Sequence, residues 1–187
     1  MSLVRILVVT GASGAGKTAT VEALEARGIA GVRCFYFDSI GVPSAEVMER
    51  DYGGGERWQA SATRDWLTRL SRLSQEIRVA VLDGQVRPSV ALEAAAQAGN
   101  RGVHVALIDC SSDVRAARLR GSRHQPELAN ARMDQWAAYL RGQADALNLV
   151  IIDTTALSVR EAADQLEKLV RRLNEPDSAV PLHTPAA

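Results

Sequence analysis

The residues with the clearest chemical purpose form an octet near the start of the chain. They follow the apolar run 3–9 and match the pattern G-x-x-x-x-G-K-[ST] at every fixed position: Gly11, Ala12, Ser13, Gly14, Ala15, Gly16, Lys17 and Thr18. Glycine backbones turn with positive φ and bring successive N–H groups onto a phosphate, which also faces the positive end of the following helix. In this pattern the lysine reaches the β- and γ-phosphates and the threonine hydroxyl holds Mg²⁺. The octet therefore predicts binding of a nucleoside triphosphate with Mg²⁺. We expect ATP and Mg²⁺ as cofactors, although the sequence does not distinguish ATP from GTP.

Two aspartates stand where apolar runs of strand character end. Asp83 closes the run 79–82, and Asp38 closes the run 32–37. Strand ends on this side of an open α/β sheet face the ligand crevice, and a carboxylate there suits Mg²⁺ or its water shell. We expect Asp83 to be a metal ligand together with Thr18. Three roles stay open for Asp38: ordering the water of magnesium, accepting a proton from an acceptor hydroxyl, or capping the turn that follows.

Four arginines gather on the segment 113–124, at positions 115, 118, 120 and 123. The transition state of phosphoryl transfer spreads charge over oxygen atoms, and preorganised guanidinium groups stabilise that charge where water is excluded. We expect Arg118 and Arg120 to be catalytic, ahead of Arg115 and Arg123, and Arg115 to contact the nucleotide. A solvated basic helix face is the alternative for each of them.

The elements that position these groups follow from hydrophobic patterning. Helical stretches alternate with five apolar, β-branched runs, at 3–9, 32–37, 78–82, 103–109 and 148–152. This alternation predicts an α/β fold with a parallel sheet covered on both faces. The longest helical pattern runs from Trp58 to Ile77. A shorter helix is expected after 41–43, with Pro43 in its first turn and the glycines at 53–55 as its end, and Ser158 with Glu161 forms a plausible capping box.

Composition bounds the class of protein. The 187 residues include 22 Lys plus Arg and 22 Asp plus Glu, so no global field attracts nucleic acid or an anionic membrane. No stretch approaches the ~20 apolar residues of a membrane span, and the amino terminus lacks the flanks of a signal peptide. Cys34 and Cys110 have neither metal nor disulfide spacing, which suits a reducing compartment. We expect one cytoplasmic domain over 1–174, monomeric or homodimeric, with a small-molecule partner and a loose tail at 175–187.

The overall plan resembles the nucleoside monophosphate kinase-like group of P-loop kinases. That resemblance implies a three-layer P-loop NTPase fold with sheet order 2-3-1-4-5. The segment 82–88, L-D-G-Q-V-R-P, is similar to the L-D-G-F-P-R of adenylate kinase with one residue inserted, which implies that Arg87 binds the phosphate of the acceptor. The stretch 37–58 looks like shikimate kinase, where an aspartate after the second strand meets the acceptor hydroxyl and G-E-x-x-F-R follows. This resemblance implies a substrate contact from Asp38.

A third resemblance concerns the acceptor side. The sequences E-R-W at 56–58 and R-D-W-L at 64–67 are similar to the D-R-x-x-W-L of gluconate kinase, which implies substrate contacts from Arg57 and Arg64. In this group the acceptor lies under helices such as those expected at 41–77. The segment 119–127 would be a lid whose arginines close over the transferring phosphate, and the loop after the last strand would pack against adenine.

These features predict an ATP-dependent phosphotransferase that acts on a small molecule, with a hydroxyl acceptor preferred. A nucleoside monophosphate kinase is the first alternative, because its acceptor brings an ionised phosphate and needs an arginine more than a base. A nucleotide-gated regulatory protein is the second, because residues 11–28 also resemble the opening of RNase adapter proteins.

Overall fold

A five-stranded parallel sheet forms the centre of the molecule. The computed structural model describes residues 4–74 and 76–175. The strands are β1 (Arg5–Thr10), β2 (Val32–Tyr36), β3 (Val79–Asp83), β4 (Val103–Asp109) and β5 (Val150–Asp153). They lie in the order β2-β3-β1-β4-β5, and every neighbouring pair is parallel. The predicted strand order and the parallel sheet are therefore confirmed.

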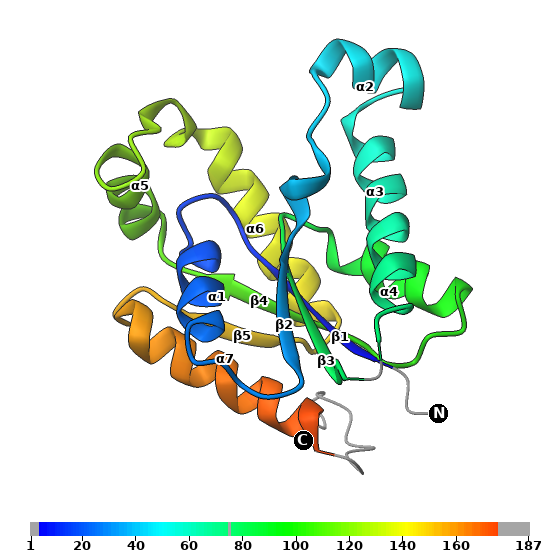
Figure 1. Cartoon of the computed structure of the whole chain (residues 1–187). Helices are drawn as coiled ribbons and strands as arrows, with labels where there is room; N and C mark the ends of the chain where they lie inside the picture. The colour runs from blue at the N-terminus through cyan, green and yellow to red at the C-terminus, as the bar shows by residue number, and fades with distance from the viewer. Residues whose placement is uncertain (1–3, 75, 176–187) are drawn as a thin grey trace.

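Helices cover both faces of this sheet (Figure 1). One face carries α1 (Lys17–Glu25) and α7 (Val159–Asn174). The other carries α3 (Gly55–Leu70), α4 (Pro88–Gln97) and α6 (Ala131–Ala146). The capping box predicted for α7 is present, with Ser158 and Glu161 each bonded to the other's backbone N–H. The prediction of three layers is confirmed.

The alternation of side chains along β1 assigns its residues to the two layers. Ile6 and Val8 pack in the cluster that includes α3 and α4, whereas Leu7 and Val9 pack in the cluster that includes α1 and α7. Successive residues of a strand point to opposite faces, and both faces are covered here, so a continuous apolar run is what the position requires.

The remaining elements extend from the carboxyl ends of the strands (Figure 1). After β2 the chain forms the 3₁₀ turn η1 (Phe37–Ile40) and α2 (Ala45–Tyr52), which leads into α3. After β4 it forms α5 (Ser112–Arg120) and the 3₁₀ turn η2 (Pro126–Leu128). In Figure 1 the two segments lie apart, on either side of the strand ends where the predicted site lies.

Two predicted helix boundaries were wrong. The helix expected to run to Ile77 ends at Leu70, although Leu73 and Ile77 still pack against the core from the following turns. Apolar spacing alone does not distinguish a helix from a turn that continues to pack. Pro43 precedes the N-cap Ser44 and is not within α2, which ends at the left-handed Gly53.

The structure adds two further observations on the sequence-based expectations. Among the described helices, none combines the length and apolar character needed to cross a membrane. The tail predicted at 175–187 lies, apart from Glu175, outside the described residues.

Candidate functional site

The phosphate loop, residues 11–18, joins β1 to α1 in a conformation that only glycine permits at key points. Gly14 has φ 83°, and a Cβ there would lie 2.9 Å from the Cγ atoms of Arg115 and Leu119. A Cβ on Gly11 would lie 2.1 Å from the carbonyl oxygen of Ile108. The glycines at 11 and 14 therefore meet both a conformational and a steric need.

Lys17 lies at the start of α1 with its side chain buried. Its Nζ lies 3.4 Å from the carbonyl oxygen of Ala12, within the phosphate loop. Burial lowers the pKa of the ammonium below its ordinary value, while the nearby charges of Asp83 and Asp38 raise that pKa. The lysine is thus a desolvated charge beside two carboxylates, ready to pair with an anion in the loop.

Asp83 ends β3 and is buried directly beside α1. Thr18 Oγ1 donates a 2.7 Å hydrogen bond to Asp83 Oδ2. The other carboxylate oxygen, Oδ1, is buried and has no hydrogen-bond partner among the described residues. Burial raises the pKa of Asp83, opposed by the charge of Lys17 and the Thr18 hydrogen bond. An unsatisfied carboxylate oxygen beside a threonine hydroxyl fits Mg²⁺ or its water shell, since hard cations prefer such oxygens.

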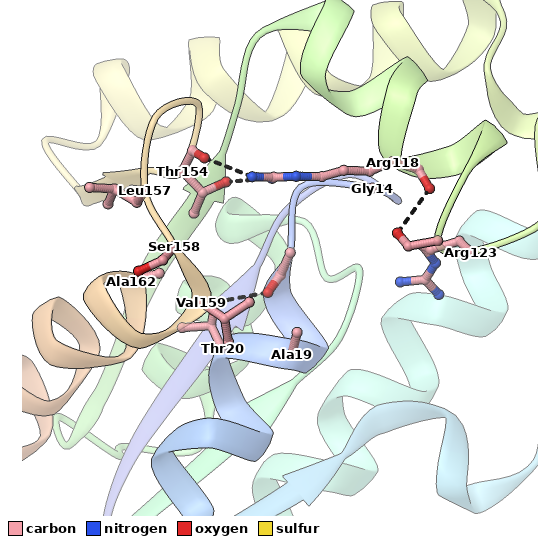
Figure 2. Close-up of a pocket in the computed structure, with 12 residues that line it drawn as sticks. Gly14, Ala19, Thr20, Arg118, Arg123, Thr154, Leu157, Ser158, Val159 and Ala162 are labelled. Carbon is pink, nitrogen blue, oxygen red and sulfur yellow. Dashed lines mark hydrogen bonds between the residues drawn. The ribbon is translucent and has the colours of Figure 1, made fainter.

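A small pocket of about 190 Å³ lies where the phosphate loop, α1, α5 and the β5–α7 loop meet. Arg118 spans one side of it and reaches across to Thr154, as Figure 2 shows. Its Nη1 donates to Thr154 Oγ1 at 2.9 Å and its Nη2 to Thr154 O at 2.8 Å. Thr154 Oγ1 donates in turn to Ala15 O at 2.7 Å. Arg118 therefore ties α5 to the β5–α7 loop and, through Thr154, to the phosphate loop.

The other three arginines of this segment lie in different surroundings. Arg123, in the turn after α5, lines the small pocket, and its charge lowers the pKa of both Lys17 and Asp83. Arg120 is exposed, with no hydrogen bond or ion pair to any described residue. Arg115 is buried and donates to Cys110 O at 3.1 Å and to Asp134 Oδ1 at 2.5 Å. The sequence ranked Arg120 above Arg123, whereas the arrangement brings Arg123 to the phosphate side.

Asp38 lies in η1, immediately after β2, and its side chain is exposed. Its charge raises the pKa of both Lys17 and Asp83, so the three groups share one electrostatic environment. The carboxyl ends of β2 and β3 are neighbours, since Tyr36 pairs with Asp83. The structure thus brings together Lys17, Thr18, Asp83 and Asp38, as the sequence analysis expected.

A large pocket of about 790 Å³ lies between α3, the β3–α4 loop, η2 and α6. Arg87 and Arg132 line it, together with the amides of Gln59, Gln85 and Asn130. Such convergent polar groups are typical of a ligand site. Of the described residues in the segment 41–77, where the acceptor was expected to bind, only Gly55, Glu56 and Gln59 of α3 line this pocket.

Arg87 is held in a defined position within the large pocket. Its Nη1 donates to Gln59 Oε1 at 2.5 Å, and its Nε lies 3.4 Å from Glu56 Oε1. Its guanidinium also sits 5.0 Å above the ring of Trp136, which stacks on Tyr139. A stacked guanidinium loses less freedom on binding an anion, so this arrangement preorganises Arg87.

The two arginines expected from the gluconate kinase resemblance lie elsewhere on α3. Arg57 and Arg64 are exposed, and neither is among the residues that line the large pocket. An α-helix turns 100° per residue, so both lie far around the helix from Gln59, which lines the pocket together with Gly55 and Glu56. Arg57 instead lies against Gly53.

A chain of hydrogen bonds, not foreseen from the sequence, links the large pocket to the phosphate loop. Gln59 Nε2 donates to Gln85 O at 2.6 Å, and Gln85 Nε2 donates to Ser13 Oγ at 2.6 Å. Through Gln59 the chain reaches Arg87. Glutamine amides carry no motif, so only the position of Gln85, directly after Asp83-Gly84, could have pointed to this role.

Comparisons with known proteins place the fold. No protein-family model and no curated protein matches the chain. A shikimate kinase from Acinetobacter baumannii aligns at a TM-score of 0.60 and 16% identity over 93% of this chain and 96% of that one. A Deinococcus radiodurans tunicamycin resistance protein aligns at 0.63 and 21% identity over 97% and 99%. A Sinorhizobium meliloti 1021 gluconokinase aligns at 0.53 and 22% identity over 91% and 95%. The chain therefore has the fold of P-loop small-molecule kinases.

Proposed function

We propose that this chain is an ATP-dependent phosphotransferase that moves the γ-phosphate of Mg·ATP to a small-molecule acceptor. The observation that carries the proposal is the buried Lys17 beside Asp83, within a complete phosphate loop. Isolated buried charges are costly, and they are retained where an ionic ligand uses them. The large pocket provides space for a second substrate next to this loop.

Thr18 and Asp83 are the residues that would hold magnesium, which neutralises charge on the phosphates when bound. The free Oδ1 of Asp83 supports this assignment. Asp83→Asn should raise the Mg²⁺ concentration needed for nucleotide binding, because an amide is a weaker ligand for a hard cation than a carboxylate. Superimposable Mg²⁺ titrations of mutant and wild type would make Asp83 a structural residue.

The remaining roles in phosphate binding and transfer fall to Lys17 and three arginines. The phosphate loop and Lys17 bind the β- and γ-phosphates, and Arg123 stabilises charge that develops during transfer. Arg118 positions α5, the helix that leads into the segment 119–127, against Thr154. Arg115 bonds to Asp134, and its side chain packs against Gly14 of the phosphate loop. Closure of the segment 119–127 would keep water from taking the phosphate.

A hydroxyl acceptor is the preferred substrate class in this proposal. A hydroxyl has a high pKa and gains from a positioned carboxylate, and Asp38 shares the environment of Lys17 and Asp83. The position of Arg87 in the large pocket favours the second candidate, a nucleoside monophosphate kinase, because a guanidinium suits an acceptor phosphate. The partner in either case is a small molecule, neither nucleic acid nor membrane. We place the activity in the cytoplasm and in a monomer or homodimer.

The test is a screen for ADP release over sugars, nucleosides, nucleoside monophosphates and hydroxy acids. We expect one acceptor class to raise ADP formation well above hydrolysis without acceptor, and Lys17→Ala to reduce that rate by about three orders of magnitude. Slow hydrolysis with every compound, combined with protein-partner binding that changes with nucleotide, would replace the enzyme by a regulatory protein.

A further inference from the structure

One exposed aromatic side chain lines the large pocket. The exposed large hydrophobic side chains among the described residues are Val42, Tyr52, Tyr139 and Val159. Of these four, only Tyr139 lines the large pocket, and it is 41% exposed. A tyrosine ring has a wide apolar surface and prefers to stack on other flat groups. The exposed part of this ring is therefore available to a ligand in the pocket.

The ring of Tyr139 is held in place by its neighbours. It stacks on the ring of Trp136, with the ring centroids 5.4 Å apart and an angle of 19° between the planes. Gln143 Nε2 donates a 2.9 Å hydrogen bond to the hydroxyl oxygen of Tyr139. The guanidinium of Arg87 lies 5.0 Å from the centroid of the Trp136 ring and adds a third flat group to the cluster. A side chain that is already fixed loses little freedom when a ligand binds, so Tyr139 is a preorganised flat surface.

The amide group beside Tyr139 is fully engaged within the protein. Gln143 Nε2 donates to Ser89 Oγ at 3.0 Å as well as to the Tyr139 hydroxyl, and Gln143 Oε1 accepts from the Ser89 N–H at 3.1 Å. A sugar or sugar acid at this place would bring several hydroxyl groups, and each one buried without a partner is costly. The faces of a conjugated ring need no such partners. The surroundings of Tyr139 therefore suit a flat apolar group better than a polyhydroxyl chain.

The phosphate loop and Tyr139 meet the connection from β3 to α4 at different points. Gln85, near the start of this connection, donates to Ser13 of the phosphate loop. Ser89, at the start of α4, bonds to Gln143, which bonds to Tyr139. A ligand that extends along the connection can therefore present a hydroxyl group near the phosphate loop and a ring to Tyr139. The pocket volume of about 790 Å³ is in the range that holds drug-sized ligands.

We infer that the phosphate acceptor carries a planar conjugated ring, which stacks on Tyr139. The inference rests on the proposed function, because it names the substrate class of the same pocket. Nucleosides and aromatic hydroxy acids both have such a ring together with a hydroxyl group that can receive the phosphate. Simple sugars and aliphatic hydroxy acids lack the ring, so they bind more weakly.

The test compares compounds that differ by the ring, through their dissociation constants measured by calorimetry on the full chain saturated with Mg·ADP. Adenosine and uridine are compared with ribose, their monophosphates with ribose phosphate, and phenyllactate with lactate. We expect a ring-bearing compound to bind about tenfold or more tightly than its ringless partner, because stacking of a base on an aromatic side chain contributes that much.

The comparison also identifies the source of the ring. A preference within the nucleoside or nucleotide sets supports a nucleoside acceptor, and a preference within the phenyllactate pair supports an aromatic hydroxy acid. Binding of the ringless compounds as tightly as their partners in every set, or no binding of any ring-bearing compound, would overturn the inference.

Three variants test the assignment to Tyr139. Tyr139→Ala should weaken the ring-bearing compound by about tenfold and leave its ringless partner unchanged, because only the ring contacts this side chain. Tyr139→Phe keeps the ring and should retain most of the affinity. Tyr52→Ala, at a tyrosine of 40% exposure that does not line the pocket, should change neither constant. Equal losses for both compounds, or no loss with Tyr139→Ala, would contradict stacking on Tyr139. Thermal unfolding checks that each variant folds.

The inference and the proposed function can fail separately. Ring-selective binding without any transfer of phosphate would leave the inference intact and remove the kinase. Transfer to ringless acceptors alone would keep the kinase and remove the inference.

Discussion

Lys17 shows how a functional charge opposes the stability of the fold that holds it. The side chain is buried, and the protein lowers the pKa of the ammonium because burial disfavours its charged form. Asp83 is affected in the complementary way, since burial raises the pKa of its carboxyl group. Each group therefore costs stability in the charged form that phosphate or metal binding requires.

The cost of Lys17 can be measured through pH. The pKa of Lys17 in the folded state lies below its value in the unfolded chain. Between these two pKa values the unfolded chain binds more protons than the folded one, so the free energy of unfolding rises with pH. This pH window ends at about 10.4, the pKa of the unfolded lysine. Lys17→Met should raise the free energy of unfolding at pH 7 without nucleotide and flatten the rise of that free energy as the pH approaches about 10.4. Urea denaturation measures both.

Lys168, an exposed residue of α7, supplies the control. Lys168→Met should change neither the free energy of unfolding nor its pH profile beyond a few tenths of a kcal/mol, roughly the range of surface substitutions. A Lys17→Met protein less stable than wild type would contradict the account of Lys17 as a strained charge.

The lid arginines give a second prediction at this scale. Arg123→Ala should lower the maximal rate by about a hundredfold to a thousandfold with little change in ADP affinity, because its charge is used only when transfer occurs. Arg120→Ala, three residues away on the exposed face, should retain nearly full activity. Steady-state kinetics on the acceptor found in the screen separates them, and the opposite ranking would restore Arg120 as the catalytic residue.

The loop between β3 and α4 is the element that joins the two pockets. Gln85 contacts Ser13 of the phosphate loop with its side chain and Gln59 of α3 with its carbonyl oxygen. The same loop carries Arg87 into the large pocket. A displacement of α3 would therefore reach the phosphate loop through two hydrogen bonds.

Two glutamine variants test whether Gln85 serves the phosphate loop and Gln59 serves the large pocket. Gln85→Ala should weaken binding of Mg·ADP by about three- to tenfold, because the lost hydrogen bond holds the phosphate loop in shape. Gln59→Leu should leave ADP binding unchanged and raise the acceptor Michaelis constant, because it removes the contact that orients Arg87. Titration with a fluorescent nucleotide and steady-state kinetics provide the two readouts. Identical effects of both variants would mean that Gln85 and Gln59 do not serve separate pockets.

At the scale of the whole molecule, the fold and half of the site could be predicted from the sequence. The phosphate loop, Asp83 and the covered parallel sheet depend on local patterns, which short-range sterics and hydrophobic periodicity determine. The large pocket could not be predicted so well, because it is built by α3, α6 and a loop that tertiary packing brings together. Gln59 and Gln85 belong to no motif. The apolar stripe that begins at Trp58 already indicates that Arg57 and Arg64 lie away from the buried side of α3.

The acceptor class depends on the whole arrangement, and the two candidate classes predict different effects for two variants. With a hydroxyl acceptor, Asp38→Asn should reduce the maximal rate by about a hundredfold to ten-thousandfold, since general base catalysis is lost. With a nucleoside monophosphate, Arg87→Lys should instead raise the acceptor Michaelis constant strongly, because bidentate phosphate contacts are lost. Kinetics on the identified acceptor decides between them. Full activity of Asp38→Asn would exclude the preferred hydroxyl mechanism.

The most direct test of the account is transfer of the labelled γ-phosphate of ATP to an acceptor, followed by mass spectrometry of the product. We predict that the wild-type chain yields a phosphorylated small molecule carrying the label, in an amount equal to the ADP formed. Folded Lys17→Ala should yield almost none. Label found only in inorganic phosphate across every acceptor class, or an undiminished yield with Lys17→Ala, would contradict the proposal that this chain is a small-molecule kinase.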